Sequence, residues 1–110
     1  MDHKTFAKLV DTRMKTCRAV LIAKAKEYAS ETFNDDRLCQ FKEMADFNYE
    51  IPERSCWNLA GKHLFSIRNM LFLLQSGEEP TEEYVAEKLT DLHNYLYLLE
   101  GLLADRRGAA

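Results

Sequence analysis

The stretch Val85-Ala-Glu-Lys-Leu-Thr-Asp-Leu-His-Asn-Tyr-Leu-Tyr-Leu-Leu-Glu-Gly-Leu-Leu103 decides the fold class. Apolar residues recur in it at intervals of 4, 3, 4, 3 and 4 positions, which places them on one face of an α-helix. Thr81 precedes the stretch as the expected N-cap, and two glutamates follow it where the helix dipole favours acids. We expect this leucine stripe, with Leu92 and Leu96 at its centre, to be buried.

Helical periods of the same kind cover the rest of the chain. One apolar stripe spans residues 6–28, a short one spans 38–45, and a third spans 56–74. No run of useful length alternates with period two, so no strand is predicted. We expect an all-α fold, a four-helix bundle with one short helix, in a single domain over residues 1–105 with a frayed tail over 106–110.

Composition restricts the function classes. The 110 residues carry a net charge of −3, whereas a generic nucleic-acid binder is basic, so a nucleic-acid partner is not expected. The cysteines, an odd number without a CxxC pair, predict reduced thiols. The longest apolar run, Met70–Leu74, is too short for a bilayer span, and the start of the chain lacks the pattern of a signal peptide. We therefore expect a cytoplasmic protein without a membrane partner.

A second face of the last helix carries polar groups. Glu87, Asp91 and Asn94 fall within an arc of about 60° at 100° per residue. Two carboxylates four residues apart can share Mg²⁺, which prefers oxygen ligands. Three interpretations remain open: a metal site with Glu87 and Asp91 as ligands, a solvated surface, or a polar patch within a subunit interface.

Basic side chains also interrupt the apolar stripes. Lys24 lies on the first stripe one turn before Tyr28, and His63 lies on the third beside Lys62. A lysine on a core face needs a partner or an anionic ligand, although its stem can also extend along the surface to reach water. A histidine there is either a hydrogen-bonded core residue or a functional group. The predicted ligand-binding residues are Lys24, Tyr28, Lys62, His63 and Asn94.

The last helix has a further apolar side in its C-terminal half. Tyr95, Leu98 and Leu102 lie away from the leucine stripe, and a small monomer buries only one face of a helix well. We therefore expect this second side to form the interface of a homodimer or a higher symmetric oligomer.

Short motifs in a fixed order carry a family resemblance. They include Lys24-Ala-Lys-Glu-Tyr28, Asp36-Arg37, Gln40-Phe41, Lys62-His63 and Glu87-Lys-Leu-Thr-Asp91. The series covers residues 20–104 and resembles a family of small helical phage and prophage proteins. That family is similar in turn to the MazG-like all-α nucleoside triphosphate pyrophosphohydrolases, whose helix-borne acids hold Mg²⁺. For a phage-encoded chain, the cytoplasm concerned would be that of the host cell.

The resemblance implies a MazG-like nucleotide-binding protein, with Mg²⁺ as cofactor and pyrophosphohydrolysis of nucleoside triphosphates as the corresponding activity. The Glu87–Asp91 segment is similar to the EExxD segment of those enzymes, but Lys88 stands where they have a second acid. Their upstream ExxE pair is replaced by Lys62-His63. Two alternatives therefore remain: a non-catalytic module that sequesters a nucleotide against host defences, and a structural or regulatory helical oligomer.

Overall fold

The structure is a computed structural model that describes residues 1–32 and 35–108, with the side chains of residues 28–32 outside the description. It consists of α1 (His3–Thr32), α2 (Cys39–Asn48), α3 (Pro52–Gln75) and α4 (Glu82–Arg106). No strand occurs in these ranges. The prediction of an all-α fold with four helices, one of them short, is confirmed.

Local sequence sets the helix ends. The Thr81 hydroxyl accepts a hydrogen bond from the Tyr84 backbone N–H at 3.1 Å, as expected of the N-cap of α4. Pro52 occupies the first turn of α3, where its missing N–H has no helical acceptor to lose. The chain leaves α3 through Gly77, whose φ of 86° is left-handed and favours glycine. These signals explain why α3 and α4 form a hairpin.

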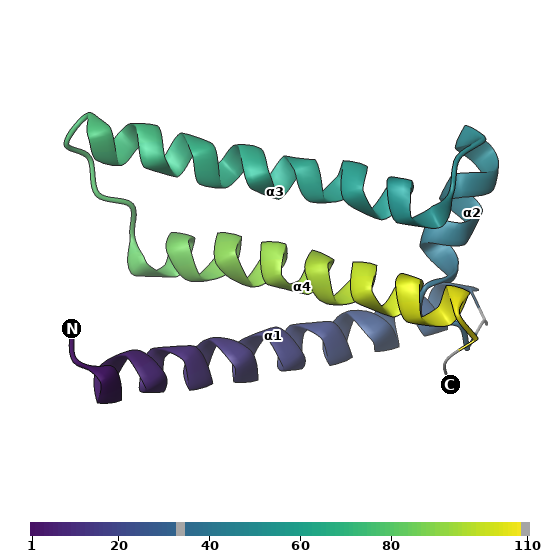
Figure 1. The fold of residues 1–110 in the computed structure, drawn as a ribbon, viewed down its shortest axis with the longest axis horizontal. Coiled ribbons are helices and arrows are strands. Elements are labelled where there is room, and N and C mark those ends of the chain that lie inside the picture. Colours follow the sequence, from purple (N-terminus) through teal and green to yellow (C-terminus); the bar gives the residue numbers. More distant parts are fainter. Residues whose placement is uncertain (33–34, 109–110) are drawn as a thin grey trace.

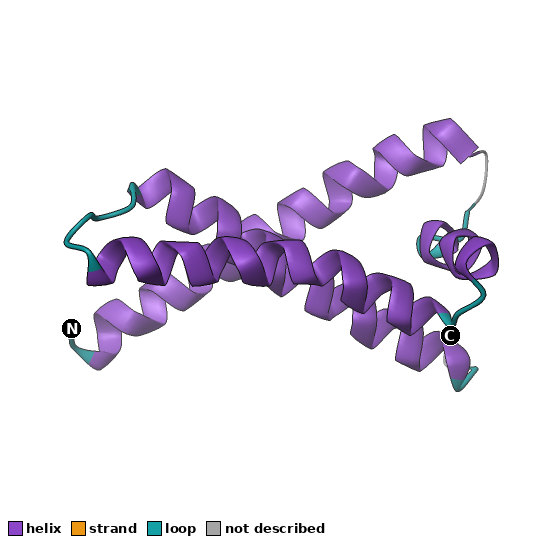
Figure 2. Cartoon of the chain, turned by 90° about the horizontal axis from the view of Figure 1, so that it is seen from above, coloured by secondary structure: helices purple, strands orange, loops and turns teal. Residues whose placement is uncertain are grey.

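The helices form a layer that α2 closes at one end. Antiparallel α3 and α4 lie side by side, and α1 follows the other flank of α4 (Figure 1). Viewed from above, α1 crosses α4 at an angle (Figure 2). The short helix α2 packs against α3. The N-terminal half of α1 leaves its apolar side chains exposed, namely Phe6, Leu9, Val10 and Met14.

The main core lies where α2, α3 and α4 meet. Phe41, Cys56 and Leu102 are its fully buried members. The Phe41 and Tyr95 rings meet edge to face at 6.5 Å between centroids. Partly buried residues complete the cluster: Leu38, Leu59, Tyr95, Leu98 and Leu99. The Tyr95–Leu98–Leu102 side, which the sequence assigned to a subunit interface, thus packs inside the protomer; that prediction was wrong because α2 and α3 cover this side.

The register predicted for the leucine stripe of α4 was also wrong. Leu96 is 47% exposed, whereas Thr90 and Asn94 are buried. The physical reason is the position of α1, which packs against the polar side of α4 and places Arg13 Nη1 3.0 Å from the Thr90 hydroxyl. Hydrogen bonding of this kind allows a polar side chain to be buried. Leu96 and Leu103 are therefore left on the outside, whereas Leu92 is half-buried and Leu99 packs against the main core.

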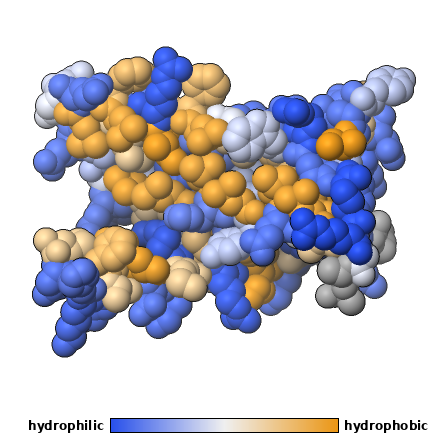
Figure 3. Space-filling view, in the orientation of Figure 1, coloured by the Kyte–Doolittle hydropathy of each residue, from blue (hydrophilic) through white to orange (hydrophobic). Residues whose placement is uncertain are grey.

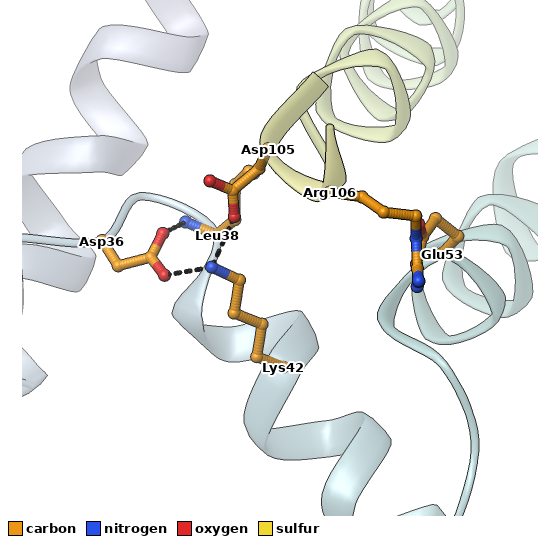
Figure 4. Close-up of polar contacts among 6 residues, drawn as sticks. All are labelled: Asp36, Leu38, Lys42, Glu53, Asp105 and Arg106. Carbon is orange, nitrogen blue, oxygen red and sulfur yellow. Dashed lines mark hydrogen bonds and ion pairs between the residues drawn. The ribbon is translucent and has the colours of Figure 1, made fainter. Parts of the chain in front are cut away.

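Ion pairs tie the segment before α2 to the end of α4 (Figure 4). Lys42 Nζ lies 2.6 Å from a carboxylate oxygen of Asp105 and 2.6 Å from one of Asp36. These contacts raise the pKa of Lys42 and lower that of Asp36. Arg106, predicted to lie in the tail, ends α4 and donates to the largely buried Glu53 of α3. The ties hold the chain that enters α2 against α4, beside the candidate site.

Candidate functional site

A small cavity with both polar and apolar walls lies between α1, α4 and the start of α2. Its volume is about 30 Å³, enough for a water molecule or one small chemical group but not for a whole nucleotide. Among its walls are Lys24 from α1 and both Asp91 and Asn94 from α4. Three of the predicted site residues therefore line one cavity, although Lys24 is at least 67 positions from the other two in the sequence. Its other lining residues are Leu21, Arg37, Gln40, Tyr95 and Leu98.

Asn94 is the buried polar group of this cavity. Its side chain is 6% exposed, and its Oδ1 has no hydrogen-bond partner among the described residues. Leaving a buried acceptor unpaired costs about 1–3 kcal/mol. A donor in the cavity, from water or from a ligand, would remove that cost. Asn94 follows Asp91 by three positions, so both side chains line the same cavity from one side of α4.

Asp91 links the cavity to α3 through His63. His63 Nδ1 lies 3.6 Å from Asp91 Oδ2, and about four fifths of each side chain is buried. The His63 ring packs on Tyr95, with 4.9 Å between centroids and 34° between planes. His63 is thus not a wall of the cavity but packs behind Asp91. At 3.6 Å the two groups are in contact but not hydrogen-bonded, and His63 stands where a positioning group for the carboxylate would lie.

Basic groups stand on two sides of the cavity. Lys24 is exposed, so its ammonium reaches solvent at the mouth. Arg37, in the turn that leads into α2, is half-buried. Lys24 is the exposed cation of the cavity lining, and Asp91 is its acid. An anionic group at the mouth would therefore be attracted.

Other predicted site residues lie elsewhere. Lys62 is exposed on α3 and does not line the cavity. The side chain of Glu87 is 64% exposed and lies 3.9 Å from Lys88 Nζ. The side chain of Tyr28 falls outside the described residues. Within the described part of the chain, no three His, Cys, Asp or Glu side chains converge as metal ligands would. Glu87 and Asp91 therefore provide two carboxylates on one side of α4, without a third ligand.

Three residues of the cavity were missed as site residues: Arg37, Gln40 and Tyr95. Arg37 and Gln40 belong to the motif series of the family resemblance, which was a usable signal. Tyr95 gave the signal of an aromatic residue beside the two acids of α4. Neither signal showed that the turn before α2 folds back onto α4, because that depends on Lys42 binding Asp36 and Asp105.

Comparisons with protein-family models, curated proteins and solved structures find no match. In the ranges that the structure describes, no helix combines the length and the apolar character that crossing a bilayer requires. The buried cysteines are all free thiols, and burial raises the pKa of the Cys56 thiol to about 11. Such a thiol is protonated at neutral pH and is a poor nucleophile.

Proposed function

We propose that this protein binds a small phosphorylated ligand of the nucleotide class at the mouth of the α1–α4 cavity. The observation that carries the proposal is the convergence of Lys24, Asp91 and Asn94 on one space, with the buried Asn94 oxygen unpaired within the described chain. Polar groups that converge on a cavity with an unmet hydrogen bond are the usual basis of a ligand site. A phage origin and a MazG-like ancestry agree with this proposal and stay predictions.

Cavity size and charge assign a role to each wall. Because 30 Å³ admits only one small group, most of the ligand lies outside, across the mouth. There the exposed Lys24 attracts the phosphate charge. An amino or hydroxyl group of the ligand, or a water molecule that it holds, donates to Asn94 Oδ1. Asp91, oriented by His63, accepts a second hydrogen bond from the same group.

Magnesium is the proposed cofactor of this site. Glu87 and Asp91 fit Mg²⁺ in kind, because this ion often binds through one or two carboxylates and completes its shell with water and phosphate oxygens. When bound, it would neutralise phosphate charge and act as a Lewis acid. Glu87 and Asp91 would hold the ion, while His63 would keep the Asp91 carboxylate facing it. Pyrophosphohydrolysis of a nucleoside triphosphate is the corresponding proposed activity.

Binding without turnover is the second candidate. Lys88 replaces an acid of the segment that the MazG-like enzymes use, and Glu87 is mostly in solvent. No cluster of three potential ligands exists in the described ranges. These observations favour a module that sequesters a nucleotide over an enzyme. A purely structural or regulatory oligomer is the remaining alternative, and it predicts no ligand at the cavity.

A thermal-shift screen tests the proposal. Nucleoside mono-, di- and triphosphates are added with and without Mg²⁺; a ligand at one hundred times its Kd stabilises a folded protein by about 2.7 kcal/mol. We expect stabilisation by at least one nucleotide, reduced in Lys24→Gln and retained in Lys26→Gln. Lys26 is the matched control, because it is exposed on α1 but does not line the cavity. No shift with any nucleotide, or equal losses in both variants, would contradict the proposal.

A further inference from the structure

Two rows of large apolar side chains with a seven-residue period lie on the outside of α3 and α4. We call these six residues the heptad face: Trp57, Leu64 and Leu71 on α3, and Leu89, Leu96 and Leu103 on α4. Five of the six are at least 40% exposed, and Leu89 is half-buried. A period of seven keeps side chains on one seam when another helix packs along it.

Both rows face the same side of the α3–α4 layer. Cys56 and His63 of α3 contact Tyr95 and Asp91 of α4. Counted at 100° per residue, the α3 row lies about 80–100° around its helix from the former pair, and the α4 row about 100–140° from the latter. Because the helices are antiparallel, these rotations bring the rows to one side. Apolar side chains gather over α3 and α4 on the face in Figure 3. The heptad face is therefore one surface and not two separate stripes.

The composition of this surface is unlike that of a solvated helix face. Charged residues make up 30% of the chain, yet none occupies the heptad face. None occupies the adjoining inner rows either, which are Ala60, Ile67 and Leu74 on α3 and Val85, Leu92 and Leu99 on α4. Charged residues stand at the outer edge of the heptad face instead, among them Arg68 on α3 and Glu100 on α4. An apolar centre without charge inside a polar rim is typical of a protein interface.

The total surface points the same way. The protomer exposes 8391 Å², whereas a compact 12.8 kDa monomer exposes about 6,300 Å² by size scaling. Its radius of gyration is 16.3 Å, against about 13 Å for a compact domain of this length. The excess of about 2,000 Å² includes the exposed N-terminal half of α1, and it is more than the roughly 800 Å² per partner that a standard interface needs.

We propose that the heptad face binds the same face of a second copy of this chain. Two α3–α4 hairpins then form an antiparallel four-helix bundle about a two-fold axis, the arrangement that seven-residue periods favour. A two-fold axis fits because one self-complementary apolar surface suffices for both partners.

The dimer leaves the ligand cavity open. Leu96 and Asn94 are two positions apart, about 200° around α4, so the heptad face and the cavity lie on opposite sides of the helix. The dimer does not depend on the proposed ligand, and either proposal can fail without the other.

Mass measurement in solution tests the dimer. Light scattering and sedimentation equilibrium of the full chain at tens of micromolar should give twice 12.8 kDa. Leu96→Glu should halve that mass, because it places a charge at the centre of the interface, while circular dichroism keeps its helical signal. Leu71→Glu tests the same face from the other helix. Ile22→Glu is the matched control: Ile22 is 42% exposed on α1, away from the heptad face.

Three results would overturn the inference. The first is a monomeric wild-type chain, including one that sediments with lipid vesicles or with another protein. The second is a dimer that both Leu96→Glu and Leu71→Glu leave intact. The third is a dimer that Ile22→Glu dissociates as readily as they do. If Leu96→Glu fails to fold, Leu71→Glu and the wild-type mass decide the question.

Discussion

Identical truncations on opposite sides of α4 should differ sharply in cost. Leu102 is 3% exposed and packs with Phe41 and Cys56 in the core, whereas Leu96 is 47% exposed on the heptad face. Leu102→Ala and Leu96→Ala make the same chemical change in the same helix. The change in helix propensity therefore cancels between them. The difference in cost measures burial alone.

The magnitudes follow from the exposed fractions. Leu→Ala removes three side-chain carbons, which corresponds to about 2.4 kcal/mol of transfer free energy at about 0.8 kcal/mol per carbon group. At Leu102 the cavity left behind brings the loss to about 3–4 kcal/mol. At Leu96 about half of the transfer free energy is lost and no closed cavity forms, so the cost within one protomer is about 1 kcal/mol. Since domains are stable by about 5–15 kcal/mol, both values can be measured.

Urea unfolding followed by far-ultraviolet circular dichroism is the assay. Both truncations are made in the Leu71→Glu background, which is expected to hold the chain monomeric and remove any contribution of a partner. The free energy of unfolding is compared at equal m-values. The reasoning is refuted if Leu96→Ala costs as much as Leu102→Ala in this background. Both faces of α4 would then be buried to the same extent, and the rotation of α4 about its axis would differ from the one described.

Three further predictions concern other parts of the fold. The hydrogen bond from Arg106 lowers the pKa of the Glu53 carboxyl. The pair therefore stabilises the fold at pH values above the unfolded pKa near 4.5, and this contribution is lost as the pH falls through the folded pKa. Between about pH 6 and pH 3, the free energy of unfolding should fall less in Glu53→Gln than in the wild type. Burial raises the pKa of Cys56 to about 11, so a thiol reagent near pH 8 should label Cys56 only after denaturation, and prompt labelling of the native chain would contradict its burial. In thermal unfolding, Gly61→Ala should stabilise the fold by about 0.5–1 kcal/mol, because no atom lies within 4 Å of the added methyl group. Gly77→Ala should destabilise it by about 1 kcal/mol, because the φ of Gly77 is 86°. A change of stability in the same direction for both variants would contradict the assigned conformations.

Sequence periodicity predicted the helices better than their packing. The four-helix, all-α fold and the Thr81 N-cap followed from local patterns. The inward face of α4 did not, because its regular leucine spacing is equally typical of a core stripe and of a surface that pairs with a partner helix. Thr90 and Asn94 are buried only because α1 packs on them, and a single helical period contains no information about that neighbour.

The candidate site was predictable in part for the same reason. Asp91 and Asn94 were found because they share one side of α4, and Lys24 because a lysine on an apolar stripe needs a partner. Arg37 lines the cavity from a turn without helical periodicity. Glu87 shares the side of Asp91 by angle, yet its side chain lies mostly in solvent. Angular position therefore predicted the direction of these side chains but not their surroundings.

Calorimetric titration of Asp91→Asn tests the proposed ligand site most directly. The substitution keeps the shape of the side chain and removes its charge. The titrant is the nucleotide, with or without Mg²⁺, that most stabilises the wild type. If the cavity is a ligand site, binding is lost or falls at least tenfold, and the thermal midpoint of the free protein stays within about 2 °C, well below the roughly 4–8 °C that 1 kcal/mol shifts a small domain. Unchanged binding with a lowered midpoint would contradict the proposal and assign Asp91, His63 and Asn94 to a structural network.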